Sequence, residues 1–373
     1  MADDPNPDWR LLSPHRPLSP GDDAYVARPT SGGDAIATWV VAGGNTVLVS
    51  GPTGVGKSTE LAQAAQALKS TRVACWVPVD RMANMHRLTA DELMHLVAQE
   101  LVGFARFELQ LPISDELVSA TVASQKDGEL TGGEPEAFHA SGLNAARAAV
   151  AEVARRSQQG RVALLVDGLE KLLPGPGARE IFDALSQLPE SVDLIVVIPW
   201  HAAFGGGTEP ILRGGERLHR VAALDTDDDA AVATAEFFVR VLARRLGGID
   251  ALPEPLAPLL SRAFNMSGGI PRIFLQLMAD AGTYARAKRG VAWPDDSDLS
   301  EAIADQQDSF RRALLPGDTQ AIKAVEGTDG RELDLERRVR LLAQGILLER
   351  VREGKVSLEL HPLVRHAVMN PRS

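Results

Sequence analysis

The chain has 373 residues, a length that allows two or three domains. Hydrophobic residues make up 45% and charged residues 24%, which is the balance of an ordinary soluble globular protein and excludes a disordered, collagen-like or coiled-coil chain. The formal net charge is −11, which disfavours proteins whose main work is to coat nucleic acid, because these are usually basic.

A single cysteine, Cys75, excludes a disulfide framework and a cysteine-built zinc site, and indicates a reducing compartment. The longest apolar runs, such as residues 194–198, fall far short of the roughly 20 residues needed to cross a bilayer. The acidic first residues have no apolar segment behind them and predict no secretory signal. We therefore expect a cytoplasmic protein without a membrane partner.

Residues 1–22 are rich in Pro, Ser and Asp, which predicts a flexible tail that becomes ordered only by packing on something else. From residue 23, short β-branched apolar runs alternate with helical patterns, as is typical of a doubly wound α/β domain with a parallel sheet. We assign residues 23–224 to this domain. The expected strands are 45–50, 73–77, 162–166, 194–198 and a weaker 218–224.

Three further segments complete the predicted organisation. Residues 103–142 are mixed in character and are interpreted as an insertion after a helix at about 89–102. We expect residues 225–290 to form a helical lid, because they show helical patterns and no convincing strand. Residues 291–373 are predicted to form a winged-helix domain. Its expected elements are helices around 319–326 and 334–344, then strands 346–351 and 355–360 around a turn.

The segment Gly-Pro-Thr-Gly-Val-Gly-Lys-Ser fits the P-loop pattern G-x-x-x-x-G-K-[ST] at every defined position, between a buried strand and a helix. Its glycines let the backbone N–H groups converge on phosphate oxygens, and the N-terminus of the following helix strengthens the attraction for a phosphate. Lys57 reaches the β- and γ-phosphates, and the hydroxyl of Ser58 ligates Mg²⁺. The predicted nucleotide-binding residues of this loop are Gly51, Pro52, Thr53, Gly54, Val55, Gly56, Lys57, Ser58 and Thr59.

Two carboxylates follow the third expected strand. Asp167 ends that strand at the carboxyl edge of the sheet, where ligands bind in such folds, and is the natural Walker B residue for holding Mg²⁺. Glu170 is a candidate for polarising the attacking water, and equally a helix-start carboxylate favoured by the helix dipole. It is not adjacent to Asp167, so a fast ATPase and a slow switch both remain open. The catalytic candidates are Lys57, Asp167 and Glu170, and the metal ligands are Ser58 and Asp167.

These elements together resemble one branch of the AAA+ ATPases. The P-loop, the apolar strand with Asp-x-x-Glu, the segment 267–272 in a helical lid and the C-terminal winged helix are similar to the clade of STAND signalling ATPases and origin-recognition (Orc/Cdc6-like) ATPases. The resemblance covers roughly residues 23–370. It implies ATP or ADP as ligand, Mg²⁺ as cofactor, and self-association.

The resemblance also implies roles for residues outside the P-loop. Arg28 lies in a segment similar to the one that approaches the adenine, and Pro271 matches the proline that packs near the base. Arg272 falls where the sensor-2 arginine reaches the γ-phosphate, although a helix with proline at its first position would show the same residues. His361 resembles the histidine of the Met-His-Asp motif, which touches the ADP β-phosphate. Pro362 replaces the aspartate of that motif, so a polar residue before a proline-started helix is the alternative.

Other positions expected in this family are less clear. The fourth strand should end in a polar sensor-1 residue, and His201 is the only nearby candidate. Arg213, Arg217 and Arg220 lie in a region suited to a trans-acting arginine finger, but an exposed arginine is more often a solvated charge.

Two functions are compatible with these features. The first is a STAND-like, slowly hydrolysing switch that assembles with or controls partner proteins, in bacterial defence or signalling. The second is a DNA-associated ATPase of origin-recognition or transposition-regulator type, with Arg337, Arg338 and Arg340 on the second helix of the winged helix facing duplex DNA. Acidic neighbours, such as Asp334 and Glu336, dilute that charge, so DNA is not favoured. Other P-loop roles, including a small-molecule kinase, are weaker.

Overall fold

The computed structural model of the chain divides into two compact units. The sheet unit comprises Gly32–Ser50 and Glu60–Arg220, and the lid unit comprises Met1–Ser31, Gly51–Thr59 and Val221–Ser373. The P-loop thus belongs to the same unit as the C-terminal half of the chain. The structure describes residues 7–12, 18, 20–29, 32–123, 141–199, 202–203, 216–225, 230–247, 252–253, 256–328, 330, 332–352 and 355–369.

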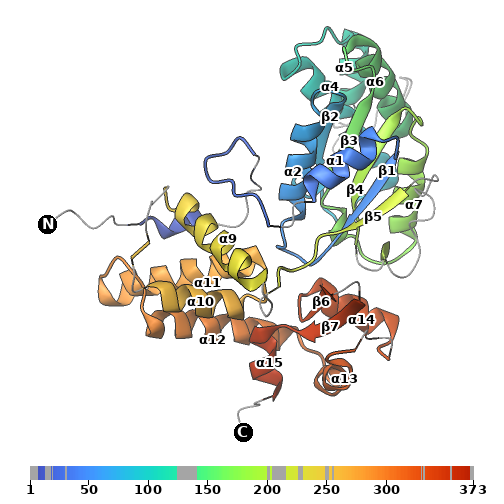
Figure 1. Cartoon of the computed structure of the whole chain (residues 1–373). Helices are drawn as coiled ribbons and strands as arrows, with labels where there is room; N and C mark the ends of the chain where they lie inside the picture. The colour runs from blue at the N-terminus through green and yellow to red at the C-terminus, as the bar shows by residue number, and fades with distance from the viewer. Residues whose placement is uncertain are drawn as a thin grey trace, which may run out of the picture. The chain divides into compact units, whose positions relative to one another are not determined.

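The sheet unit contains a five-stranded parallel sheet with the order β2-β3-β4-β1-β5 (Figure 1). β1, β3 and β4 are buried along their whole length, as expected of parallel strands that are covered on both faces. This confirms the predicted parallel α/β sheet. The strands are β1 (Thr46–Ser50), β2 (Val73–Pro78), β3 (Val162–Asp167), β4 (Val192–Val197) and β5 (Glu216–Arg220).

Helices cover both faces of this sheet. The core on one face joins the helices α4, α6 and α7 to alternate strand residues such as Cys75, Leu164 and Val196. Residues between these, such as Val49 and Leu165, are equally buried and belong to the other face, where Figure 1 shows α1 and α2. The helices are α1 (Gly33–Val41), α2 (Lys57–Leu68), α3 (Val79–Met82), α4 (Ala90–Phe107), α5 (Asp115–Ala123), α6 (Gly142–Arg156), the short η2 (Leu169–Lys171) and α7 (Pro176–Ser186).

The predicted insertion at 103–142 is partly described. α4 continues to Phe107, and α5 follows it. Residues 124–140 lie outside the described part of the chain. The fifth strand spans Glu216–Arg220 instead of the expected 218–224, and beyond it the amide of Leu224 donates to the carbonyl of Gly269.

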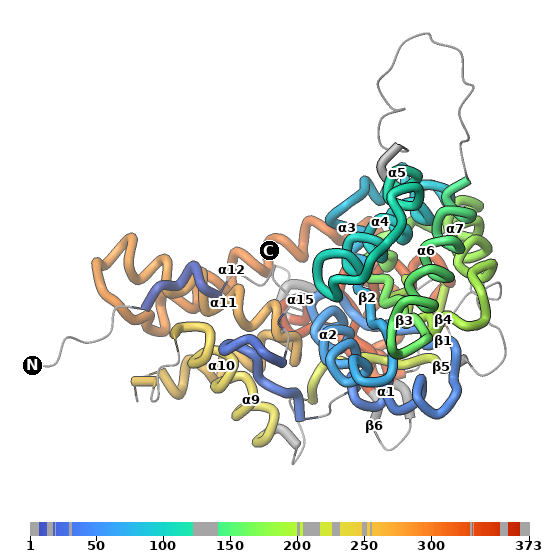
Figure 2. Tube along the Cα trace, turned by 90° about the horizontal axis from the view of Figure 1, so that it is seen from above, coloured from blue at the N-terminus to red at the C-terminus, as the bar shows by residue number. Residues whose placement is uncertain are grey.

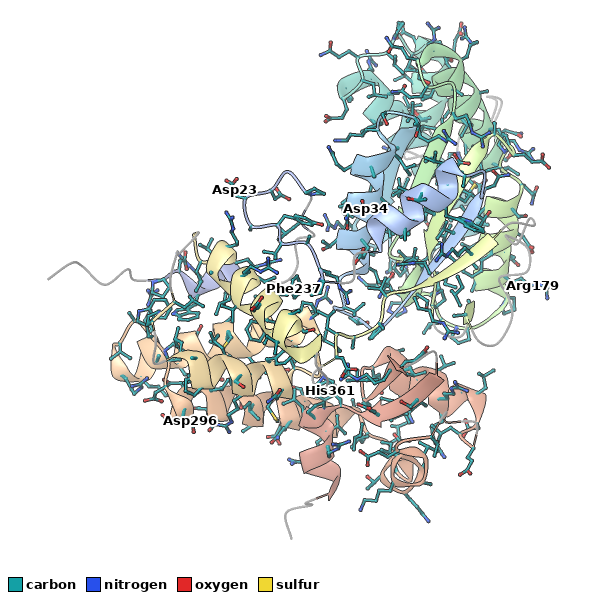
Figure 3. All side chains as sticks on the ribbon, viewed as in Figure 1. Asp23, Asp34, Arg179, Phe237, Asp296 and His361 are labelled. Carbon is teal, nitrogen blue, oxygen red and sulfur yellow. The ribbon has the colours of Figure 1, made fainter. Side chains whose placement is uncertain are left out.

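The lid unit has a helical core rich in phenylalanine. The ring of Phe238 lies 5.1 Å from that of Phe264 and 4.9 Å from that of Phe274, centroid to centroid. Figure 3 labels Phe237, its neighbour on α9, which is part of the same core. The helices are α9 (Ala230–Arg245), α10 (Ala257–Met266), α11 (Pro271–Tyr284), the π-helical η5 (Ala285–Arg289) and α12 (Asp296–Ala313). Because Leu299 and Ile303 join this core, α12 packs with the lid helices, although the sequence placed it in the C-terminal domain.

The N-terminal segment also packs on these helices. Trp9–Leu12 form a 3-10 helix, η1, with Trp9 and Leu12 buried. The indole nitrogen of Trp9 donates to the carbonyl of Ala292 over 3.1 Å, and a Cβ at Gly282 on α11 would come within 2.0 Å of the indole. Figure 2 shows this segment alongside α11. Within the expected flexible tail of residues 1–22, Trp9–Leu12 are therefore a folded part of the lid unit.

The C-terminal elements follow the predicted order of two helices and a hairpin. They are α13 (Asp318–Val325), α14 (Leu335–Ala343), the antiparallel strands β6 (Leu347–Arg352) and β7 (Lys355–Leu360), and α15 (Pro362–Met369). Among the helices of the described segments, none has the length and apolar character that a bilayer crossing requires.

Candidate functional site

The P-loop connects β1 to α2 and takes a conformation that only glycine allows at two positions. Gly54 has φ +82° and Gly56 has φ +108°, both in the left-handed region. A Cβ at Gly54 would lie 2.5 Å from the Cβ of Arg272, and one at Gly51 would lie 2.3 Å from the carbonyl oxygen of Val221. The loop is therefore closely packed on one side, and its glycines fit the tight backbone that phosphate binding requires.

Lys57 starts α2 and is 5% exposed. Its Nζ donates to the carbonyl oxygens of Gly51 and Pro52 over 3.0 and 3.1 Å. A buried ammonium is stable only with such partners, and here they hold its charge inside the loop. With Ser58 beside it at the helix N-terminus, this arrangement suits a phosphate group. The other loop residues differ in exposure: Val55 is fully buried and Thr53 is exposed.

Arg28 lies against the P-loop. Its guanidinium donates through Nη1 to the carbonyl of Val55 over 3.0 Å and through Nη2 to that of Ala222 over 2.9 Å. Gly56 is adjacent, since a Cβ there would be 3.8 Å from Nη1. The segment expected to approach the adenine is thus tied directly to the loop by its arginine.

Pro271 and Arg272 begin α11 beside the same loop. Pro271 occupies the first turn of the helix, where its missing N–H costs nothing. The amide of Arg272 donates to the carbonyl of Gly54 over 3.3 Å. The structure therefore brings Arg28, the P-loop, Pro271 and Arg272 together within the lid unit.

Asp167 and Glu170 belong to the sheet unit. Asp167 ends β3 and is 5% exposed, and Glu170 follows in η2. Because the strands are parallel, β3 ends at the same sheet edge as β1, which continues into the P-loop. Gly168 between the two acids has φ +95°, and a Cβ there would lie 2.8 Å from the amide nitrogen of Asp80.

Asp80 was not among the predicted site residues. This residue follows β2 at the same edge, and its carboxylate pairs with the ammonium of Lys171 over 2.5 Å. The only signal for it in the sequence was an aspartate three residues after the apolar run 73–77. Asp80 therefore lies against the turn that carries Asp167 and Glu170.

His361 is fully buried at the start of α15 (Figure 3). Its ring stacks on Phe310 at 4.9 Å between centroids, and its Nδ1 accepts a hydrogen bond from the amide of Leu363 over 3.2 Å. Burial lowers the pKa of His361 to about 3, and the positive charge of Arg350 adds to this, while the backbone of Ser267 acts in the opposite direction. Its backbone amide donates to the carbonyl of Ile346 over 3.0 Å, so these partners all belong to the lid unit. The structure does not group it with the P-loop.

Two of the three arginines considered for DNA binding form ion pairs with an acid of the C-terminal region. Arg340 pairs with the buried Asp318 over 2.6 Å, and Arg337 lies 3.5 Å from the same carboxylate. Burial alone raises the pKa of Asp318, but the Arg340 hydrogen bond, the Leu315 amide and the two positive charges outweigh it and lower the pKa. Two of the three arginines thus balance an internal acid. Arg338, the third, also has a partly buried side chain.

The remaining positions of interest are only partly described. His201 and Arg213 lie outside the described residues. Arg217 places its guanidinium 5.5 Å from the centre of the Trp39 ring, which gives it a cation–π contact within the sheet unit.

Comparisons with known proteins agree with this geometry. Residues 38–198, which include the P-loop and Asp167, match the family described as AAA ATPase domain. The Walker-type ATPase PABY2304 of Pyrococcus abyssi is similar in structure, with TM-score 0.57 and 15% identity over 96% of this chain and 99% of that one.

A second solved structure is the Orc2 protein of Aeropyrum pernix in ADPNP–ADP complexes, with TM-score 0.50 and 13% identity over 97% of each chain. No curated protein matches the sequence. At these identities the structural similarity shows the fold alone. The match to the AAA ATPase domain over residues 38–198 includes the P-loop, and the two structural similarities extend the likeness in fold to nearly the whole chain.

Proposed function

We propose that this chain is a regulatory ATPase, similar to STAND proteins, that switches between nucleotide states and so assembles with or controls partner proteins. The observation that carries the proposal is the direct backbone bond between the P-loop and the first turn of α11, Arg272 N–H to Gly54 C=O. Because the loop that holds the phosphates is bonded to the lid, a change of nucleotide that shifts the loop also shifts the start of α11. Such a connection suits a switch.

The nucleotide site takes its roles from the P-loop and its neighbours. Lys57 neutralises the β- and γ-phosphates, and Ser58 and Asp167 are the proposed ligands of Mg²⁺. When bound, Mg²⁺ would neutralise phosphate charge. Glu170 orients the attacking water, Arg28 and Pro271 adjoin the base, and Arg272 reports the γ-phosphate to the lid. His361 is proposed to report the diphosphate state only when the C-terminal elements move, because it is buried against Phe310 here.

Self-association and partner control are supported by the structural similarity to an Orc protein and by the resemblance to STAND proteins. The Orc2 structure is described in complexes with ADPNP and ADP, a triphosphate analogue and a diphosphate, which are the two states that a switch distinguishes. A role in bacterial defence or signalling follows from the STAND resemblance. The input signal and the effector are to be sought among proteins that co-purify with the chain.

The alternative is a DNA-associated ATPase, which the similarity to the Orc2 protein favours. The internal ion pairs of Arg337 and Arg340 with Asp318 argue against it, since these charges are then less available to phosphates. The net charge of −11 argues in the same direction.

The deciding experiment measures ATP turnover and the affinity for ATP and ADP of the purified chain, with and without duplex DNA at near-physiological salt. Slow turnover, tight ADP binding and indifference to DNA are expected of the switch. Strong stimulation of ATP turnover by DNA would instead favour the DNA-associated ATPase. Absence of any nucleotide binding would overturn both.

A further inference from the structure

Arg350 on β6 is a buried charge whose partners come from three parts of the lid unit. It is 3% exposed, and its Nη1 donates to the carbonyl of Leu224 over 2.8 Å. Its Nη2 donates to the carbonyl of Gly268 over 3.0 Å, and its Nε to the carboxylate of Glu359 over 3.3 Å. A buried guanidinium is costly unless its donors are satisfied, so this fork bonds the hairpin to two segments far away in sequence.

The two segments held by Arg350 are themselves locked together. The amide of Leu224 donates to the carbonyl of Gly269 over 3.0 Å. Gly269 has φ +75°, and a Cβ there would come within 1.8 Å of the Leu224 carbonyl oxygen. Gly268 is equally enclosed, because a Cβ there would lie 2.8 Å from Leu348 and 3.2 Å from His361. The backbone at this point has little freedom to move independently of the hairpin.

The same glycines lead directly into the nucleotide site. Ile270 follows them and is buried with Ala223 and with Leu348 of β6. Pro271 then starts α11, and Arg272 bonds to Gly54 of the P-loop. A continuous series of contacts therefore runs from the buried Arg350 of the hairpin to the loop.

We propose that Arg350 is a positioning residue that holds the start of α11 against the P-loop, so that the position of the C-terminal hairpin controls how tightly nucleotide is retained. A protein partner that draws the β6–β7 hairpin away from Leu224 and Gly268 would loosen Arg272 from Gly54 and speed nucleotide exchange. The first half of this inference concerns the structure alone. The second half rests on the proposed nucleotide binding.

Hydrogen exchange of the nucleotide-free full chain tests the first half. Arg350→Met keeps the stem length and the apolar packing but removes the donors to both carbonyls. We expect the amides of Leu224 and Arg272 to exchange at least about tenfold faster, because two buried hydrogen bonds from a charged group are lost. The amides that pair β6 with β7 should keep their protection. Unchanged exchange at Leu224 and Arg272 would overturn the inference.

The release rate of a fluorescent ADP analogue tests the second half. Arg350→Met should release it at least about tenfold faster than the unsubstituted chain. Arg350→Lys keeps the positive charge and serves where the Met variant does not fold. Because one ammonium cannot reproduce the two-pronged contact, it should also release the analogue faster. Wild-type release rates in a variant with loosened Leu224 and Arg272 amides would reject control of nucleotide retention.

A matched control separates this effect from the loss of any arginine in the region. Arg365→Met breaks the exposed pair of Arg365 with Glu326 and touches neither Leu224 nor Gly268. It should leave both the exchange pattern and the release rate unchanged, and equal effects in both variants would overturn the assignment. If the unsubstituted chain binds no ADP analogue, the proposed function fails, while hydrogen exchange still decides the structural half.

Discussion

The amide nitrogen of Arg272 lies 3.3 Å from the carbonyl oxygen of Gly54, to which it donates a hydrogen bond. This bond places the first turn of α11 on the P-loop. The approach requires glycine at position 54, because a Cβ there would lie only 2.5 Å from the Cβ of Arg272. The lid and the phosphate loop therefore share one local packing arrangement.

Replacing Lys57 by alanine should abolish nucleotide binding and leave the fold intact. The ammonium is bonded to two loop carbonyls and is the one positive group that the P-loop motif supplies to the phosphates. We expect ATP and ADP affinity to fall by at least about 100-fold in calorimetric titrations. Lys69→Ala, an exposed lysine at the end of the α2 region, is the control and should bind normally. Unchanged affinity in the Lys57 variant would reject the assignment of the loop.

Asp167→Asn should lower Mg²⁺-dependent ATP turnover by at least about tenfold, because the amide is a poorer metal ligand than the carboxylate. Nucleotide binding without Mg²⁺ should be little changed. The assay is steady-state phosphate release over a range of Mg²⁺ concentrations. Normal turnover at every concentration would show that the end of β3 does not serve the metal.

Glu170→Gln distinguishes a catalytic role of Glu170 from a purely structural one. If Glu170 orients the attacking water, turnover should fall by at least about tenfold while ATP affinity stays the same. If the carboxylate only favours the start of η2, turnover should stay near the wild-type rate. Single-turnover measurements with saturating protein distinguish the two outcomes.

Arg340→Ala should destabilise the lid unit by about 3 kcal/mol, because it leaves the carboxylate of Asp318 buried with a weaker partner. Urea unfolding of the full chain at neutral pH provides the measurement. Arg311→Ala breaks an exposed pair with Asp308 and should cost less than about 1 kcal/mol. Weak DNA binding of the unsubstituted chain that disappears in the Arg340 variant, with stability unchanged, would contradict the structural role.

Stability should fall in acid because of His361. Its pKa is about 3 in the folded chain and 6.5 when unperturbed, so protons bind preferentially to the unfolded state below pH 6.5. The stability associated with neutral His361 is complete above that pH and is lost progressively as the pH falls towards 3. The expected loss at pH 5 is about 2 kcal/mol. His361→Asn should remove this component from the difference between urea unfolding curves at pH 7 and pH 5. Parallel losses in both proteins would contradict the assignment.

The sheet and the backbone conformation of the P-loop could be predicted because their signals are local. Each strand is an uninterrupted apolar run, and the P-loop is a contiguous motif whose backbone conformation depends on its own glycines. Arg28, Pro271 and Arg272 were identified from a resemblance, and the structure groups them with the loop. Nothing in their local sequence alone indicates that grouping.

What the sequence did not reveal depends on partners far away along the chain. Trp9 is buried because Gly282 leaves room for its indole, and the residues around Trp9 in the sequence do not predict this burial. Arg350 resembles any charged residue of a hairpin until its two carbonyl partners are known. The partner of Arg337 and Arg340 could not be identified from the sequence either. They were candidates for DNA binding, and in the structure both lie beside the carboxylate of Asp318.

The contact between Trp9 and Ala292 has a consequence for synthesis of the protein. The two residues are 283 positions apart, so the ribosome has already made α10 and α11 before the indole finds its hydrogen-bond acceptor. The sheet unit, which ends at Arg220, can complete its core much earlier. Until then the apolar N-terminal turn is exposed on the growing chain, where it is a natural target for chaperones that bind nascent hydrophobic segments.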